Sequence, residues 1–184
     1  MARPKQRWIA PVAGLLLLQA FAVVAYFSVE RGRSGTSTAF QFEHVNEPSV
    51  LPKASLVRAD GTALRSEELL GQPVLLHFWA TWCPPCREEL PNLLRLNQQG
   101  RGLKVVAITV DEDWTVVRQF FGGTVPPEVV REVTGSVVKS YEVGQLPDSY
   151  LLDKNGRAVL RFGGARDWSS EGAQAALAPY LGGR

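Results

Sequence analysis

Residues 74–91 constrain the fold of this chain most, because they place both of its cysteines between a strand-like and a helix-like segment. Residues 74–79 are apolar and aromatic apart from one histidine and follow a Gly-Gln-Pro sequence, which predicts a buried strand. The segment after the cysteines predicts a helix that ends near Gln99, before two glycines. The sequence therefore predicts a strand, a sharp turn and a helix that begins at the cysteine pair.

Two prolines separate the cysteines and fix how the helix begins. Cys83 is the expected N-cap, and Pro84 takes the first helical position, where a missing N–H does no harm. Pro85 removes a second donor, so the amide of Cys86 is the one left for an N-cap acceptor. A Cys83 thiolate would lie at the positive end of the helix dipole, a setting that lowers the pKa of a thiol. We expect Cys83 to be the exposed, attacking sulfur and Cys86 the more buried, resolving one.

A CxxC pair can also bind zinc, which requires two further ligands. The chain contains only two histidines, His44 and His77, and no other cysteine. Two cysteines this close together also constrain little unfolded chain, so a structural role for a disulfide is disfavoured. A redox-active dithiol is the better hypothesis, with no metal site expected.

The stretch Phe78-Trp79-Ala80-Thr81-Trp82-Cys83-Pro84-Pro85-Cys86-Arg87-Glu88-Glu89-Leu90-Pro91 resembles the active-site signature of the membrane-anchored thioredoxin-like reductases. That family includes proteins that reduce apocytochrome c and proteins that reduce copper-site cysteines of respiratory oxidases. The resemblance extends from about Leu51 to the C-terminus. It implies a thioredoxin-like α/β fold, with a central mixed sheet flanked by helices, and no organic cofactor.

The same resemblance implies a second part of the site at Leu146-Pro147. In the family this proline follows a cis peptide bond and packs against the disulfide, and the residue before it offers its backbone to an incoming peptide. Leu146, Trp82 and Pro84 are therefore the predicted substrate-binding residues, and Pro147 joins the catalytic set. Asp148-Ser149 departs from the hydroxyl-rich pair more usual there. A carboxylate close to the thiols would raise their pKa and disfavour acidic substrates.

The resolving cysteine needs a proton acceptor, and the sequence offers two. His77 lies six residues before Cys83, where thioredoxin-like proteins often place a buried carboxylate, and alternation puts it on the same strand face as Leu75 and Trp79. Glu89 lies three residues after Cys86, on the same helix face, and members of the family have an acid there. Burial would raise its pKa toward the working range of a base. We favour Glu89 and leave open whether His77 is functional or a neutral core histidine.

The N-terminus predicts a membrane anchor. Residues 8–29 carry no charge, are long enough to span a bilayer and follow three basic residues, which places residues 1–7 in the cytoplasm. The apolar run is longer than the core of a secretory signal, although Ala20-Phe21-Ala22 would fit a cleavage site. We expect a tail over 1–7, an anchor over 8–29, a linker over 30–50 and an extracytoplasmic domain over 51–184, attached to the inner membrane by a single pass.

The net charge of +2 does not indicate nucleic-acid binding. Residues 46–184 contain 15 Lys and Arg against 16 Asp and Glu, so the basic excess lies near the predicted anchor.

The remaining sequence alternates between strand-like and helix-like segments, as α/β domains do. We expect a hairpin over 54–64 and a short helix capped by Ser66. Further strands are expected over 104–110, within 125–133, in a segment that ends at 152, and over 158–162. Further helical segments are expected over 114–121, 136–141 and 170–181. The acids at 111–113 predict a strand end and a helix N-cap. The alternative is that Glu112 lies near the cysteines, as a carboxylate does in some relatives.

These observations predict an extracytoplasmic enzyme that reduces disulfides in protein partners and is itself reduced by a membrane-embedded thiol donor. Apocytochrome c and copper-site proteins are possible clients. The same residues could serve an oxidase. A copper chaperone is disfavoured because the chain has a single methionine, at position 1. A peroxidase is disfavoured because no proline-and-threonine loop precedes Cys83.

Overall fold

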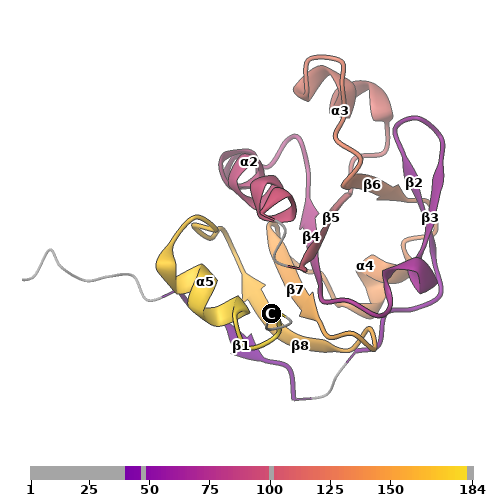
Figure 1. The fold of residues 1–184 in the computed structure, drawn as a ribbon. Helices are drawn as coiled ribbons and strands as arrows, with labels where there is room; N and C mark the ends of the chain where they lie inside the picture. Colours follow the sequence, from indigo (N-terminus) through magenta and orange to yellow (C-terminus); the bar gives the residue numbers. More distant parts are fainter. Residues whose placement is uncertain (1–39, 47–48, 100–101, 182–184) are drawn as a thin grey trace, which may run out of the picture. The chain divides into compact units, whose positions relative to one another are not determined.

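An eight-stranded mixed sheet forms the centre of the domain in the computed structural model, which describes residues 40–46, 49–99 and 102–181. The strand order is β1-β8-β7-β4-β5-β6-β2-β3 (Figure 1). The elements are β1 (Glu43–His44), β2 (Ser55–Arg58), β3 (Ala63–Arg65), the 3-10 helix η1 (Ser66–Leu69), β4 (Val74–Trp79), α2 (Pro84–Gln98), β5 (Lys104–Thr109), α3 (Trp114–Phe120), β6 (Val129–Glu132), α4 (Ser136–Ser140), β7 (Asp148–Leu152), β8 (Ala158–Gly163) and α5 (Glu171–Leu177).

The central strand β4 is buried along its whole length, since helices cover both faces of the sheet. It pairs in parallel with β5 and antiparallel with β7. Leu75 and Trp79 face a core that includes residues of α2, α3 and α5, whereas Leu76 and Phe78 face a second core that includes residues of η1 and α4. Figure 1 shows α2 and α5 on one side of the sheet and α4 on the other. The predicted thioredoxin-like arrangement is confirmed.

The sheet begins earlier in the chain than the sequence indicated. Glu43 and His44 form β1, which pairs antiparallel with β8, although residues 30–50 were expected to be a linker. Phe40 packs on the rings of Phe162 and Trp168, and its Cβ approaches Gly172 so closely that a Cβ added there would come within 2.6 Å of it. A two-residue strand has no detectable periodicity, which is why this edge was missed. The rest of the predicted linker up to residue 39, the anchor and the tail lie outside the described residues.

The other elements form close to their predicted bounds, with one difference in capping. The Ser66 hydroxyl accepts a hydrogen bond from the amide of Ala54 at 3.0 Å, so it ties η1 to the start of the hairpin. The carboxylate of Glu68 accepts from the Arg65 amide at 3.1 Å, as a capping-box acid does. The predicted N-cap of α3 is confirmed, because Asp113 accepts from the Thr115 amide at 2.8 Å.

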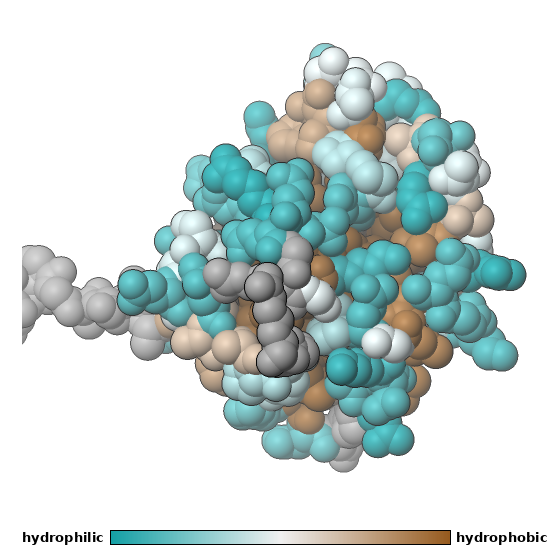
Figure 2. All heavy atoms as spheres, in the orientation of Figure 1, coloured by the Kyte–Doolittle hydropathy of each residue, from teal (hydrophilic) through white to brown (hydrophobic). Residues whose placement is uncertain are grey.

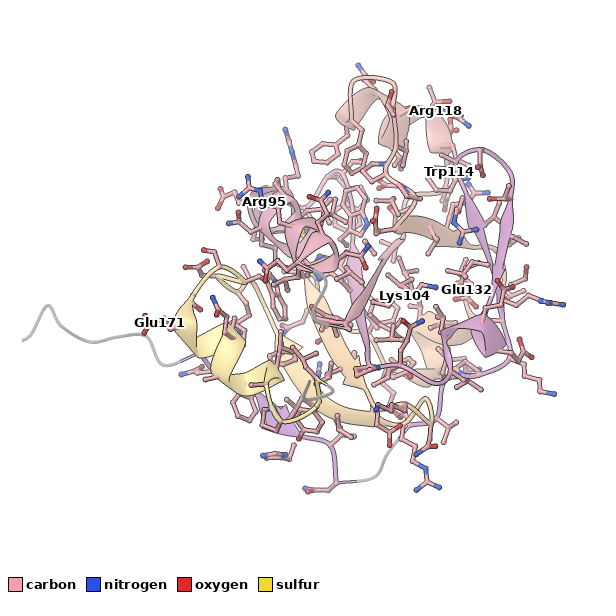
Figure 3. The ribbon with its side chains drawn as sticks, in the orientation of Figure 1. Arg95, Lys104, Trp114, Arg118, Glu132 and Glu171 are labelled. Carbon is pink, nitrogen blue, oxygen red and sulfur yellow. A yellow bond between two sulfur atoms is a disulfide. The ribbon has the colours of Figure 1, made fainter. Side chains whose placement is uncertain are left out.

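Helix α3 is joined to the β2–β3 hairpin through one side chain. Arg118, labelled in Figure 3, donates a hydrogen bond to the carbonyl of Ala59 at the hairpin turn. The face of the domain shown in Figure 2 is mainly hydrophilic, with hydrophobic residues visible between the polar ones. Over the described residues, no helix combines the length and hydropathy needed to cross a bilayer.

Candidate active site

Cys83 and Cys86 form a disulfide at the first turn of α2. Cys83 is the N-cap, and its sulfur accepts from the amide of Cys86 at 3.4 Å, as the proline pair predicted. In this oxidised state Cys83 is 5% exposed and Cys86 is fully buried. The predicted order of exposure is therefore confirmed, although Cys83 is less exposed than expected. Cys83 is therefore the more accessible cysteine of the pair, and it is the one that borders a groove.

A groove of about 620 Å³ opens beside Cys83. It is lined without any charged residue by Trp82, Cys83, Pro84, Pro85, Val110, Val138, Val143, Gly144, Gln145 and Leu146. Trp82 is 67% exposed, which is unusual for so large an aromatic side chain. All three residues expected to bind substrate, Trp82, Pro84 and Leu146, therefore line one surface next to the attacking sulfur.

The peptide bond between Leu146 and Pro147 is cis, as predicted. The Pro147 carbonyl accepts from the Gly164 amide at 2.9 Å, so this residue is tied to the end of β8. Within the described residues, neither the amide nor the carbonyl of Leu146 makes a hydrogen bond. An extended peptide in the groove could pair with both groups.

Asp148 does not bring an unpaired charge to the thiols. Its carboxylate is fully buried and accepts two hydrogen bonds from Arg161, at 3.2 and 2.9 Å. In the register of β7 and β4 it lies opposite Phe78, on the face away from α2. The sequence could not reveal this partner, because Arg161 comes from the returning strand. The expected bias against acidic substrates therefore has no basis here.

Glu89 is buried one turn after Cys86, with 5% of its surface exposed. Burial raises its pKa to about 7, which outweighs the opposing effects of the Arg166 amide, the Trp168 indole and the Arg166 guanidinium. The Arg166 amide donates to Oε2 at 2.5 Å. A carboxyl group with this pKa is half ionised near neutral pH and can accept or return a proton.

His77 lies on the strand face of Leu75 and Trp79, as alternation predicted, and Glu89 lies against this face. Its Nδ1 is 2.9 Å from the Ser149 hydroxyl, and its Nε2 is 3.5 Å from Glu89 Oε1. Complete burial lowers the pKa of His77 to about 3. The imidazole is therefore neutral at physiological pH, and Glu89 is the group that titrates there.

The structure adds Asp111, which the sequence analysis did not single out. Its carboxylate accepts from the amide and hydroxyl of Thr81 at 2.9 and 2.8 Å, and from the Thr109 hydroxyl at 2.7 Å. Asp111 thus ties the end of β5 to the turn that carries Trp82 and Cys83. The acidic cluster was visible in the sequence, but the acid that reaches this turn is Asp111, whereas Glu112 is exposed.

No group of three His, Cys, Asp or Glu side chains that could hold a metal ion is found in the described part of the chain. A disulfide at the start of a helix that follows a central strand, with a cis-proline loop across the groove, defines a thioredoxin-like thiol–disulfide oxidoreductase.

Comparison with known proteins agrees with this class. The model of the AhpC/TSA family matches residues 49–160. The thiol-disulfide oxidoreductase ResA of Geobacillus thermodenitrificans (strain NG80-2) is 32% identical over 163 residues, which cover 84% of this chain and 86% of that protein. ResA of Bacillus subtilis (strain 168) is 28% identical over 164 residues, 86% of each chain. The chain belongs to the AhpC/TSA family and, within it, to the ResA-type thiol–disulfide oxidoreductases.

Solved structures show the same fold. A thiol:disulfide interchange protein of the thioredoxin family from Chlorobium tepidum TLS aligns with a TM-score of 0.61 and 26% identity, over 75% of this chain and 99% of that one. StoA from Bacillus subtilis aligns with a TM-score of 0.56 and 25% identity, over 70% and 99% of the respective chains.

Proposed function

We propose that this protein reduces disulfides of exported protein partners through Cys83 and Cys86. The observation that supports this most directly is that Cys83, at the N-terminus of α2, borders the groove and is the less buried cysteine of the pair. A helix N-terminus stabilises the thiolate, which is the attacking form.

The reaction follows from these positions. In the reduced enzyme the Cys83 thiolate attacks one sulfur of the client disulfide, that S–S bond breaks, and a client thiolate leaves. Cys86 then passes its proton to Glu89 and attacks the Cys83 sulfur of the mixed disulfide. The second client thiolate departs, the Cys83–Cys86 disulfide re-forms, and two electrons have moved to the client. A membrane-embedded thiol donor restores the dithiol.

The groove favours a client whose cysteine lies in an extended, uncharged or apolar segment. The amide and carbonyl of Leu146, which make no hydrogen bond within the described residues, can pair with such a segment, and Trp82 and Pro84 provide apolar contact surface. Apocytochrome c and copper-site proteins of respiratory oxidases are the client classes we propose. Pro147 orders the loop opposite Cys83. Residues 8–29 would hold the domain at the inner membrane, on the extracytoplasmic side.

Replacing the resolving cysteine tests the assignment. We expect Cys86→Ser, once reduced, to accumulate a mixed disulfide between Cys83 and the client, because attack is retained and resolution is lost. The adduct can be detected as a dithiothreitol-sensitive mass increase, using disulfide-bonded peptides copied from apocytochrome c and from a copper-binding subunit.

The matched control is Cys83→Ser, which should form no adduct. Adducts with Cys83→Ser but not with Cys86→Ser would reverse the roles of the two cysteines. A reduction potential as high as that of a dithiol oxidase would instead favour oxidation of clients. Copper titration of the reduced domain tests the chaperone alternative, which predicts a tight stoichiometric complex.

A further inference from the structure

Three buried side chains from three elements meet one helical turn from Cys86. They are His77 of β4, Glu89 of α2 and Ser149 of β7, and none is more than 5% exposed. Ser149 lies directly opposite His77 in the strand register. The contacts run in one line, from Ser149 Oγ to His77 Nδ1 at 2.9 Å, and from His77 Nε2 to Glu89 Oε1 at 3.5 Å.

The second of these contacts leaves two polar atoms without a hydrogen bond. His77 Nε2 and Glu89 Oε1 are both buried and unpartnered at their present separation. An unprotonated imidazole nitrogen facing an ionised carboxylate would place two lone pairs against each other in a buried site. Such an arrangement costs free energy unless a proton lies between the two atoms. When Glu89 is ionised, that proton must be carried by Nε2.

Ser149 makes this tautomer possible. A neutral imidazole protonated at Nε2 needs a donor, not an acceptor, at Nδ1. A serine hydroxyl can rotate and donate, whereas a backbone carbonyl at the same place would require a proton on Nδ1 and leave Nε2 bare. The residue opposite His77 is therefore of the right kind to place the proton on the nitrogen that faces Glu89.

We propose that His77 is a positioning residue for Glu89, held by the Ser149 hydroxyl in the Nε2-protonated tautomer, so that its N–H supports the Glu89 carboxylate as that group accepts the proton of Cys86. This inference rests on the proposed function of Glu89. His77 stays neutral throughout and carries no proton away. The exchange is between the Cys86 thiol and the Glu89 carboxylate alone.

Several other groups also lie around the Glu89 carboxylate, and their contacts differ from the contact of His77. From the segment after β8, the Arg166 amide occupies Oε2, while the Arg166 guanidinium donates to the carbonyls of Gln41 and Ala165. The Trp168 indole N–H lies near enough to Glu89 to favour its charged form, although its geometry is not that of a regular hydrogen bond. On α2, Cys86 is the proton donor. His77 Nε2 lies 3.5 Å from Oε1, the oxygen that the Arg166 amide leaves unpaired.

Two substitutions of similar size separate a hydrogen-bonding role from packing. His77→Leu fills the site but cannot donate, whereas His77→Asn can turn its amide N–H toward Glu89. We expect His77→Leu to raise the pKa of Glu89 by about one unit. In His77→Asn the pKa of Glu89 should stay close to its wild-type value. The pKa is read from the carboxyl ¹³C shift of Glu89 in the oxidised protein, in which the cysteines do not titrate.

The same pair should differ in turnover. With Glu89 less ionised, His77→Leu should resolve the mixed disulfide about fivefold more slowly at pH 7 and recover by pH 9, while His77→Asn should stay near the wild type. Equal pKa values in all three proteins, or equal losses in Leu and Asn variants at every pH, would overturn the inference.

The tautomer can be observed directly in the wild type, even if a variant fails to fold. Ring ¹⁵N shifts at pH 9 should show His77 protonated at Nε2 and unprotonated at Nδ1. The only other histidine in the sequence is the exposed His44, so a His44→Gln variant leaves the signals of His77 alone and assigns them. A proton on Nδ1 at this pH would refute the proposal. This measurement needs no client, so its outcome is independent of the Cys86→Ser trap. A wrong tautomer with a successful trap would refute only the role of His77, and a failed trap would count against the proposed function whatever the tautomer.

Discussion

Glu89 combines a buried position with a negative charge that the proposed reaction needs. The unfolded chain ionises this group near pH 4.5, but the folded protein holds the proton until about pH 7, because burial disfavours the carboxylate. Between these values the folded state binds a proton that the unfolded chain has released. The stability that Glu89 contributes is therefore complete below pH 4.5 and is lost as pH rises toward 7.

This linkage predicts how stability depends on pH. Relative to Glu89→Gln, the free energy of unfolding of oxidised wild type should fall by about 3 kcal/mol between pH 4 and pH 8. Guanidinium titrations of both proteins at each pH measure the difference, and the shared contributions of His77 and the surface charges cancel. A difference that stays flat across this range would show that Glu89 ionises normally.

The parts of the site that depend on neighbours in sequence were predictable. The N-cap position of Cys83 and the amide of Cys86 follow from two prolines within one turn, and the cis bond before Pro147 follows from a local family pattern. The contacts of His77, the ion pair of Asp148 and the contact of Asp111 with Thr81 were not predictable, because each joins residues at least 12 apart on different segments. Alternation along the strand predicted that His77 is buried, but it could not identify the side chain that His77 contacts.

At the scale of elements, strands and helices with clear periodicity formed where the sequence placed them. The failures were short or non-local: β1 has two residues, and the Ser66 side chain binds the Ala54 amide in place of its own helix. Edge pairing is decided by the partner strand, in this case β8, whose sequence lies more than 100 residues further on. Local propensity cannot carry that information.

Asp111 shows what one non-local contact does for an element. It holds the active-site turn through the Thr81 amide and hydroxyl, so we expect Asp111→Asn to destabilise the oxidised domain by about 1–3 kcal/mol, since an amide nitrogen cannot accept these bonds. Chemical denaturation provides the measurement.

The neighbouring acid provides the control for Asp111. Glu112 has an exposed side chain, and Glu112→Gln should change stability by less than about 0.5 kcal/mol. Equal effects of the two substitutions would mean that general charge in this acidic cluster matters, and not the contact with Thr81.

For the whole molecule, two cores on opposite faces of the sheet account for the stability of the domain. In the part of the chain that the structure describes, Phe40 is the first residue to pack on the core that contains the disulfide. A chain cut at residue 51, the boundary that the sequence suggested, would lose β1, the Phe40 contacts with Phe162 and Trp168, and the Gln41 carbonyl that Arg166 binds.

Three chain lengths therefore test the organisation of the protein. We expect residues 40–184 to fold with the stability of the domain in the complete chain, and residues 51–184 to be less stable by about 2–4 kcal/mol, the scale of losing buried aromatic area and an edge strand. Guanidinium denaturation of the two shorter chains measures this difference. Equal stability would mean that the segment before residue 51 packs only loosely.

The complete chain then isolates the role of residues 8–29. An uncharged apolar run of this length is sufficient to cross a bilayer, so we expect residues 1–184 to remain in the membrane fraction after carbonate washing and to need detergent for release. Residues 40–184, directed to the same compartment by a cleavable signal, should be released in soluble form.

Both proteins should reduce a peptide disulfide equally well in detergent, because every described residue of the candidate site lies within residues 40–184. In membranes only the complete chain should be re-reduced efficiently, since an anchor raises the effective concentration of the domain near a membrane-embedded donor. Release of the complete chain as a shortened, soluble protein would show instead that the segment is a cleaved signal.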